Sequence, residues 1–192
     1  MFAPLGAKLG ARRLVRTAEA FGFNERPRVP LAKMNRISQP RNLKDDLAVG
    51  AAAIGQDRDL ATPLGMASVG ATIGARGVRA KPRIVRGAPV QRRRVVSKRV
   101  AKQVRSMMLG VVRGGTGTAA AIPGVPVAGK TGTAELVPTA NGASDPRNTD
   151  AWFVAFAPAP KPKLAVGVML VGAGAGGASA APIARQVLQA AL

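Results

Sequence analysis

The amino-acid sequence predicts an α+β fold in which helices flank an antiparallel sheet. Two apolar stretches near the C-terminus, Asp150–Pro158 and Leu164–Ala173, have the composition of strands and are joined by the short turn APAPKPK. Two such stretches with a short turn between them indicate an antiparallel hairpin. Helical spacing of apolar residues precedes this hairpin and returns after it, without internal repeats or a regular alternation of strands and helices. This order favours a mixed fold over a parallel α/β sheet.

Two helices are expected in the first part of the chain. The first spans Pro4–Phe23 and carries apolar residues on one face, and a polar loop with prolines then runs to residue 42. A short Ala-rich segment, Leu43–Ile54, leads to the second helix. That helix begins at Thr62–Pro63, because a capping hydroxyl followed by proline in the first turn is typical of a helix start, and it ends at Gly77.

Two further helices are predicted from their apolar faces. Ser97 caps the third helix, which closes at Gly114 and Gly115, and its apolar face consists of Val100, Val104, Met107, Met108 and Val111. The fourth begins near Pro182 and is expected to face the core through Ile183, Val187 and Ala191. Residues 78–99 carry the densest positive charge. The basic stretch is expected to form a solvated loop and a solvated face of the third helix, with Lys98, Arg99, Lys102 and Arg105 on that face, and an anion-binding patch is the alternative.

The composition excludes several kinds of chemistry. The 192 residues include no histidine and no cysteine, which removes Ser-His-Asp and Cys-His catalysis, disulfides and almost all zinc sites. No cofactor or metal is expected. The net charge of +20 predicts attraction to anions of many kinds, but an aromatic content of 3% leaves few side chains that could stack on bases. No specific nucleic acid is expected, although a basic anion-binding or nucleic-acid-binding module stays an alternative function.

The stretch GVPVAGKTGTAEL, residues 124–136, supports two incompatible interpretations of Lys130. Gly124–Thr131 matches the P-loop pattern G-x-x-x-x-G-K-[ST], which would make the protein a nucleotide binder. A P-loop joins a buried strand to the N-terminus of a helix. The residues before Gly124 are poor strand candidates, and Gly132 with the prolines after it leaves no room for a helix. The nucleotide-binding interpretation is therefore the weaker alternative.

The other interpretation places AGKTGTAE on a strand beside the C-terminal hairpin. Glycines at positions 129 and 132 allow a substrate backbone to lie alongside an exposed strand edge. Lys130 would then lie along a groove with the hydroxyls of Thr131 and Thr133 beside it. Such a set suits an extended peptide that ends in a carboxylate, because the ammonium supplies positive potential and the hydroxyls donate hydrogen bonds. Trp152, on the neighbouring strand, is expected to be a core aromatic residue.

Six stretches along the chain resemble one known family, the penicillin-binding protein transpeptidase domains. The ordered set AGKTGTAE, DAWFVAFAP, KLAVGVMLVG and GGASAAPIARQVL resembles the C-terminal third of such a domain. Upstream, AAAIGQDRDLATPLGMASVGATIGARGVRAKPRIV looks like the segment ahead of its Lys-Thr-Gly strand, and MFAPLGAKLGARRLVRTAEAFGFN is similar to the helix after its Ser-x-Asn motif. Residues 1–192 are therefore interpreted as a partial transpeptidase domain, α+β in class, with its N-terminal part missing.

Two motifs of that family are absent from the sequence. None of the six serines is followed by lysine three residues later or by asparagine two residues later, so neither Ser-x-x-Lys nor Ser-x-Asn occurs. The resemblance implies that the chain starts late, as a truncated reading frame, a remnant or a cloned fragment would. Because the nucleophile is missing, we expect the chain by itself to be inactive and to form no covalent penicillin adduct. No signal peptide or membrane-spanning segment is visible either.

The resemblance also implies what the complete domain does. A serine attacks the carbonyl of a terminal D-alanyl-D-alanine on a peptidoglycan stem peptide, and β-lactams trap that serine. In this chain, Lys130 is implied to bond the missing Ser-x-Asn serine and to help move protons. Thr131, Gly132 and Thr133 are implied to bind the substrate, with the N–H of Thr133 as half of the oxyanion hole. The complete protein is implied to be extracytoplasmic and anchored in the membrane.

Overall fold

The computed structural model describes residues 2–56, 58–137 and 145–192. Six α-helices lie in these ranges: α1 (Phe2–Leu9), α2 (Ala11–Phe21), α3 (Asp46–Ala53), α4 (Pro63–Gly74), α5 (Lys98–Gly114) and α6 (Ala180–Ala191). Five strands lie in them: β1 (Val78–Ala80), β2 (Arg92–Arg94), β3 (Ala128–Glu135), β4 (Thr149–Ala157) and β5 (Leu164–Leu170). Short 3₁₀ turns occur at Pro40–Asn42, Thr118–Ala120 and Pro146–Asn148. The expected α+β class is confirmed.

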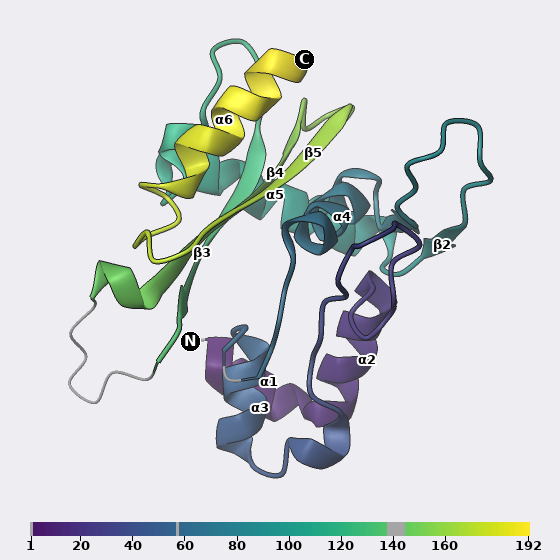
Figure 1. The fold of residues 1–192 in the computed structure, drawn as a ribbon, viewed down its shortest axis with the longest axis vertical. Coiled ribbons are helices and arrows are strands. Elements are labelled where there is room, and N and C mark those ends of the chain that lie inside the picture. The colour runs from purple at the N-terminus through teal and green to yellow at the C-terminus, as the bar shows by residue number, and fades with distance from the viewer. Residues whose placement is uncertain (1, 57, 138–144) are drawn as a thin grey trace.

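The main sheet is antiparallel, in the order β3-β4-β5. The hairpin of β4 and β5 that the sequence predicts is present, with Phe153 opposite Val168. Helix α6 lies across one face of this sheet, α4 packs on the other, and α5 lies beside β3 (Figure 1). The sheet therefore forms the middle layer between helices, and β3 lies at its edge.

Strand β4 is the centre of the core because both of its faces are covered. Successive side chains of β4 point to opposite faces of the sheet, and they are apolar on both faces, as expected for a strand between two helical layers. On one face Phe153 packs with Val112 of α5 and with Leu188 of α6. On the other face Phe156 packs with Ile73 of α4. Both phenylalanines have no exposed surface, so the position of β3, which pairs with β4, is determined by buried neighbours.

The N-terminal segment forms two helices where the sequence predicts one. The chain breaks between α1 and α2 at Gly10, whose φ of 80° lies in the left-handed region that glycine adopts without strain. The Ala-rich segment becomes α3, whose first turn is capped by the Asp45 carboxylate, which accepts a hydrogen bond from Ala48 N at 2.8 Å. In the described part of the chain, none of the helices is both long enough and apolar enough to cross a membrane.

The basic stretch between α4 and α5 is a hairpin, which corrects the expectation of a solvated loop. Strands β1 and β2 pair antiparallel, with Val78 opposite Arg94 and Ala80 opposite Arg92. The sequence gives only a weak indication of strands here, because β2 consists of three arginines and each strand has only three residues. The pairing depends on contacts between residues more than ten positions apart, which local patterns do not reveal.

The buried faces of α5 and α6 differ from the predicted ones. In α5, Ala101, Met108 and Val112 are buried, whereas Val100 and Met107 of the predicted face are 42% and 64% exposed. In α6, the buried residues are Ala180, Ala181, Ala184 and Leu188, while Val187 and Ala191 are exposed. Small alanines face the sheet because the helix packs closely against it. The caps were predicted correctly: Thr62 accepts from Gly65 N and Ser97 from Val100 N.

Candidate functional site

Strand β3 carries the predicted site residues along an edge of the main sheet. Its register with β4 places Lys130 opposite Val154, Thr131 opposite Phe153 and Thr133 opposite Ala151. The start of the strand is buried beside α5, but Lys130 and Thr133 are exposed. Among the described residues, β4 is the strand that pairs with β3, so the other edge of β3 is open to an added strand.

This geometry shows that the P-loop interpretation is wrong. The lysine and threonine of the Gly124–Thr131 match lie inside an antiparallel strand that continues to Glu135. A phosphate-binding loop needs a helix N-terminus at this point, whose free N–H groups would face the phosphates. After β3, the next helical element that the structure describes is the three-residue turn Pro146–Asn148.

The Lys130 side chain lies on the same face of the sheet as Val154, its partner in the register. Its ammonium group donates a hydrogen bond to the carbonyl oxygen of Thr131 at 2.7 Å. The side chain is exposed, so its charge is available to a ligand that lies along β3. Val154, its partner on β4, packs against Gly70 of α4.

The two threonine hydroxyls face the segments that flank the strand. Thr131 Oγ1 lies 2.9 Å from Thr116 Oγ1, in the segment after α5. Thr133 Oγ1 accepts a long hydrogen bond of 3.5 Å from Gly176 N, in the glycine-rich segment before α6. Thr116 lies in a Gly-Thr-Gly stretch that follows α5 and that, in the sequence, resembles a simple helix end. The short hydroxyl pair identifies it as a further member of the site.

Glycine at position 176 is required by the close approach of two backbones. A Cβ atom there would overlap the carbonyl oxygens of Gly132 and Trp152. The glycine-rich segment 172–177 therefore packs directly on β3 and β4 and holds the strand from one side. The glycine content of residues 172–177 indicates close backbone packing, but it does not indicate which strands the segment packs against.

Trp152 corrects another expectation. It is half-buried and does not belong to the buried core, and it lies opposite Gly132 in the sheet register. Its Cβ lies 3.0 Å from the position that a Gly132 side chain would occupy. The tryptophan therefore borders the candidate site instead of filling the interior.

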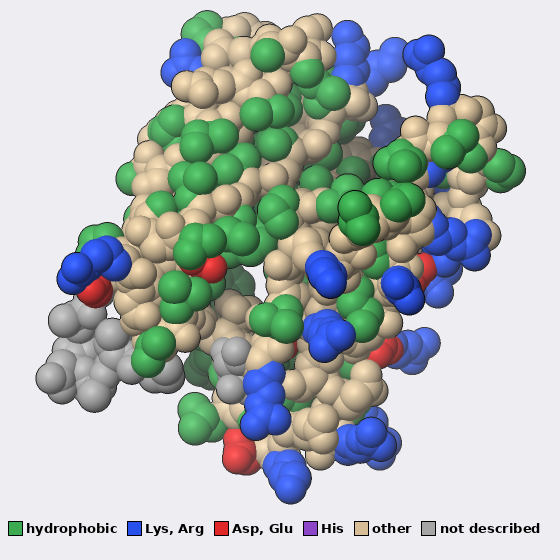
Figure 2. Space-filling view, in the orientation of Figure 1, with side chains coloured by type: hydrophobic (Ala, Val, Ile, Leu, Met, Phe, Trp, Pro, Cys, Tyr) green, Lys and Arg blue, Asp and Glu red, His purple; other side chains and the backbone are tan. Residues whose placement is uncertain are grey.

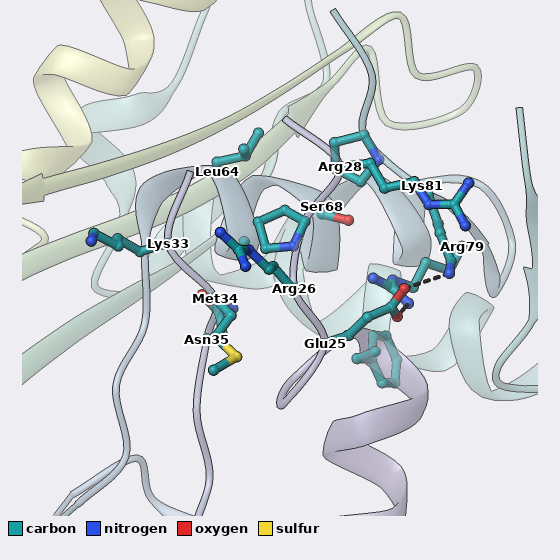
Figure 3. Close-up of a pocket in the computed structure, with 15 residues that line it drawn as sticks. Glu25, Arg26, Arg28, Lys33, Met34, Asn35, Leu64, Ser68, Arg79 and Lys81 are labelled. Atoms are coloured by element: carbon teal, nitrogen blue, oxygen red, sulfur yellow. Dashed lines mark hydrogen bonds and ion pairs between the residues drawn. The ribbon is translucent and has the colours of Figure 1, made fainter. Parts of the chain in front are cut away.

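A second cluster of polar residues lies apart from β3, between the loop after α2, helix α4 and strand β1 (Figure 3). Glu25 binds Arg79 at 2.6 Å and Lys81 at 2.5 Å. Burial raises the pKa of the Glu25 carboxyl, but hydrogen bonds and positive charge from Lys81 and Arg79 outweigh this effect, so the pKa is below its ordinary value. These ion pairs connect the loop after α2 to β1 and the residue that follows it, so their role is structural.

In the described part of the chain, the hydrogen bond of the Lys130 ammonium goes to a backbone carbonyl, that of Thr131, and not to a serine hydroxyl. Ser97 caps α5, and the hydroxyl of Ser179 donates to Ala173 O at 2.6 Å. Ser144 lies outside the described residues. Nor do the described residues include a group of carboxylates that could hold a metal ion. The site consists of a lysine, hydroxyls and backbone on an open strand, which can bind and orient a substrate.

An exposed edge strand with Lys-Thr-Gly, paired with the β4–β5 hairpin, is shared by penicillin-binding proteins and serine β-lactamases. A family model described as the penicillin binding protein transpeptidase domain matches residues 1–189. The chain belongs to this family.

Two of its relatives are named peptidoglycan D,D-transpeptidases. It is 38% identical over 211 residues to the peptidoglycan D,D-transpeptidase PbpA of Mycobacterium tuberculosis and 39% identical to PbpA of Mycolicibacterium smegmatis. All of this chain is covered in both comparisons, but only 41% of each relative, so the chain spans about two fifths of their length.

Solved structures agree with this assignment. The ceftriaxone acyl-enzyme complex of penicillin-binding protein A from M. tuberculosis matches with a TM-score of 0.84 and 36% identity, over 100% of this chain and 45% of that one. A D,D-transpeptidase domain from Eggerthella lenta matches with a TM-score of 0.76 and 35% identity, over 100% of this chain and 51% of that one.

Proposed function

We propose that this chain supplies the substrate-binding strand of a peptidoglycan D,D-transpeptidase. The observation that carries the proposal is the open edge of β3, on which Lys130 and Thr133 are exposed beside Thr131 and Gly132. An extended peptide binds such an edge by adding a strand, and main-chain hydrogen bonds then hold it in register. A stem peptide that ends in D-alanyl-D-alanine is extended and carries the carboxylate that this set of groups would attract.

Each residue of the strand has a distinct role in this proposal. Lys130 contributes positive potential and moves protons to and from the reacting serine. The hydroxyls of Thr131 and Thr133 bind the substrate carboxylate, and the Thr131–Thr116 hydroxyl pair orients the first of them. Gly132 leaves the strand surface free of a side chain. The N–H of Thr133 donates to the oxyanion that develops on the attacked carbonyl.

The reaction itself requires a serine that this sequence does not provide in a Ser-x-x-Lys motif. That serine attacks the penultimate D-alanyl carbonyl, D-alanine leaves, and the acyl group passes to an amine on a neighbouring stem peptide. β-Lactams acylate the same serine, and neighbours of this chain have been solved as ceftriaxone, imipenem and penicillin G acyl-enzymes. We place the complete protein outside the cytoplasmic membrane and anchored to it, where its substrate occurs.

Incubation of the purified 192-residue chain with a fluorescent penicillin tests the missing nucleophile. We expect no covalent band after denaturing electrophoresis, because no serine here has the lysine that activates it. PbpA of M. smegmatis is the positive control. A stable labelled band on this chain would contradict the proposal.

Binding to the strand is tested separately with a peptide that ends in D-alanyl-D-alanine. Titration followed by amide NMR should shift the resonances of β3, and Lys130→Ala should weaken the binding by up to about fivefold, because the exposed ammonium no longer attracts the carboxylate. Lys163→Ala, in the turn before β5, is the matched control and should leave the affinity unchanged. Shifts confined to residues outside β3 and its two flanking segments would overturn the assignment of the groove.

A further inference from the structure

The hairpin formed by residues 78–94 projects from the body of the molecule. Strands β1 and β2 form its base, and Lys81 N donates to Gln91 O at 3.0 Å just beyond them. The connecting segment extends to one side, away from the main sheet and from α6 (Figure 1). We call residues 78–94 the basic hairpin.

The exposed arginines of the basic hairpin have no ion pair with the acidic residues that the structure describes. The hairpin's exposed cations are all arginines: Arg83, Arg86, Arg92, Arg93 and Arg94. The sequence contains no acidic residue between Asp59 and Glu135. The ion pairs that the structure shows for this hairpin join Glu25 to Arg79 and Lys81 at its base, so they leave the projecting arginines without a carboxylate.

The end of the hairpin is apolar. Ile84 and Val85, between Arg83 and Arg86, are 68% and 64% exposed. Figure 2 shows apolar and Lys or Arg side chains next to each other on this projecting segment. These two adjacent aliphatic side chains are exposed to water, and transfer of their apolar surface to an apolar phase would be favourable.

We propose that the basic hairpin docks on the surface of a lipid bilayer that contains anionic phospholipids. Ile84 and Val85 enter the headgroup region, and the arginines around them bind lipid phosphates, for which the guanidinium geometry is well suited. Because successive strand residues point to opposite faces, Arg93 lies on one face of β2 and Arg92 and Arg94 on the other. These three arginines lie at the base of the hairpin, whereas Arg83 and Arg86 flank Ile84 and Val85 directly. Aliphatic side chains flanked by cations fit an anionic bilayer surface, which offers both phosphates and an apolar interior, better than an acidic polypeptide.

A vesicle-binding experiment with the full 192-residue chain tests the charge contribution. At physiological ionic strength, the chain should sediment with vesicles of phosphatidylglycerol and phosphatidylcholine in equal amounts, but not with phosphatidylcholine alone. The triple change R83Q/R86Q/R93Q should lower the partition coefficient about a hundredfold. Arg94 is left intact because its guanidinium donates to the carbonyl oxygens of Arg76 and Val96.

The matched charge control is R12Q/R13Q/R16Q, which removes three exposed arginines from α2. It lowers the net charge of the chain by the same amount, and we expect a change of less than about threefold because distant charges are screened. Equal losses in the two triple variants would show that binding is due only to the net charge of the chain, and they would overturn the proposal.

The apolar end is tested by I84S/V85S, which should lower the partition coefficient about tenfold. The control L31S/L47S changes two exposed leucines of the N-terminal part, 99% and 83% exposed, and should have no effect. Far-UV circular dichroism checks that each variant is folded like the parent chain. Unchanged binding of I84S/V85S would contradict insertion.

Binding to soluble polyglutamate but not to the anionic vesicles would identify an acidic polypeptide as the partner and also overturn the lipid assignment.

Discussion

The two halves of the molecule bury their apolar side chains in different ways. In the sheet region, residues 63–137 and 145–192, strand β4 is covered on both faces and six of its nine residues are fully or nearly buried apolar ones. In the N-terminal helical region, residues 2–56 and 58–62, the core is one cluster: Val15, Ile37, Leu43, Val49 and Ala52. That region leaves Phe2, Leu5 and Leu9 of α1 about half-exposed or more. Strand β3 therefore belongs to the more completely packed region.

The contacts between the two regions are polar as well as apolar, and they are local. Asn35 is 5% exposed, and its side-chain oxygen accepts hydrogen bonds from the backbone N and the hydroxyl of Thr62 within the N-terminal helical region. The Thr62 hydroxyl in turn accepts from Gly65 N of α4, which belongs to the sheet region. Glu25 pairs with Arg79 and Lys81. The difference in burial predicts that the two regions differ in stability, and that a few junction residues couple them.

The largest effect is expected from Phe153→Ala in the sheet region. Phe153 has no exposed surface, and deletion of its ring should lower the free energy of unfolding by about 3–5 kcal/mol because a cavity remains. Urea unfolding followed by fluorescence measures this change, since Trp152 on β4 is the only tryptophan. Phe2→Ala, at a side chain that is 69% exposed, is the control and should have little effect.

The corresponding change in the N-terminal helical region is Leu43→Ala. Leu43 is 6% exposed, and its truncation should cost about 2–4 kcal/mol. If the regions unfold separately, the transition seen by far-UV circular dichroism becomes biphasic while the Trp152 transition keeps its midpoint. A joint shift of both signals would show that the molecule unfolds as one unit. Leu47→Ala, at an 83% exposed side chain of α3, is the matched control.

The junction is tested by comparing two helix caps. Thr62→Ala removes the cap of α4 and its hydrogen bond to Asn35, and it should cost about 1–2 kcal/mol. Ser97→Ala removes only the cap of α5 and should cost about 1 kcal/mol or less. Thr62→Ser retains the hydroxyl and should restore most of the loss in chemical denaturation. Equal costs for the two alanine changes would argue against coupling through Asn35.

The smallest effect is expected from Glu25→Gln, about 1 kcal/mol or less, because the carboxylate is partly exposed. Its folded-state pKa is lowered from an ordinary value of 4.5, so the unfolded chain binds more protons and stability rises with pH. The stabilisation is present above pH 4.5 and is lost as the pH falls through the lower folded-state pKa. Thermal melts from pH 7 to pH 3 should therefore show the parent and variant converging at the acidic end. A constant difference would contradict the role of the ion pairs.

Much of the candidate site could be predicted from the sequence because it depends on one strand. AGKTGTAE was expected beside the C-terminal hairpin, and β3 spans those eight residues and pairs with β4. Thr116 and Gly176 could not be assigned in this way. They lie 15 and 43 residues from their partners Thr131 and Thr133, and nothing in local composition reveals such distances. Whether Lys130, Thr131, Gly132 and Thr133 bind substrate stays a prediction.

The sequence by itself determined the features that depend on neighbouring residues: the β4–β5 hairpin, the strand identity of the Lys-Thr-Gly segment, and the caps at Thr62 and Ser97. Only the tertiary structure decided which faces of α5 and α6 are buried, because α5 packs against both α4 and β3 while α6 presents alanines to the sheet. It also decided that the all-arginine segment pairs as a strand and that Glu25 binds a residue 54 positions away. The spacing of apolar residues within a segment indicates whether it forms a helix or a strand. Which of its residues are buried, and which strand it pairs with, depend on the other elements that pack against it.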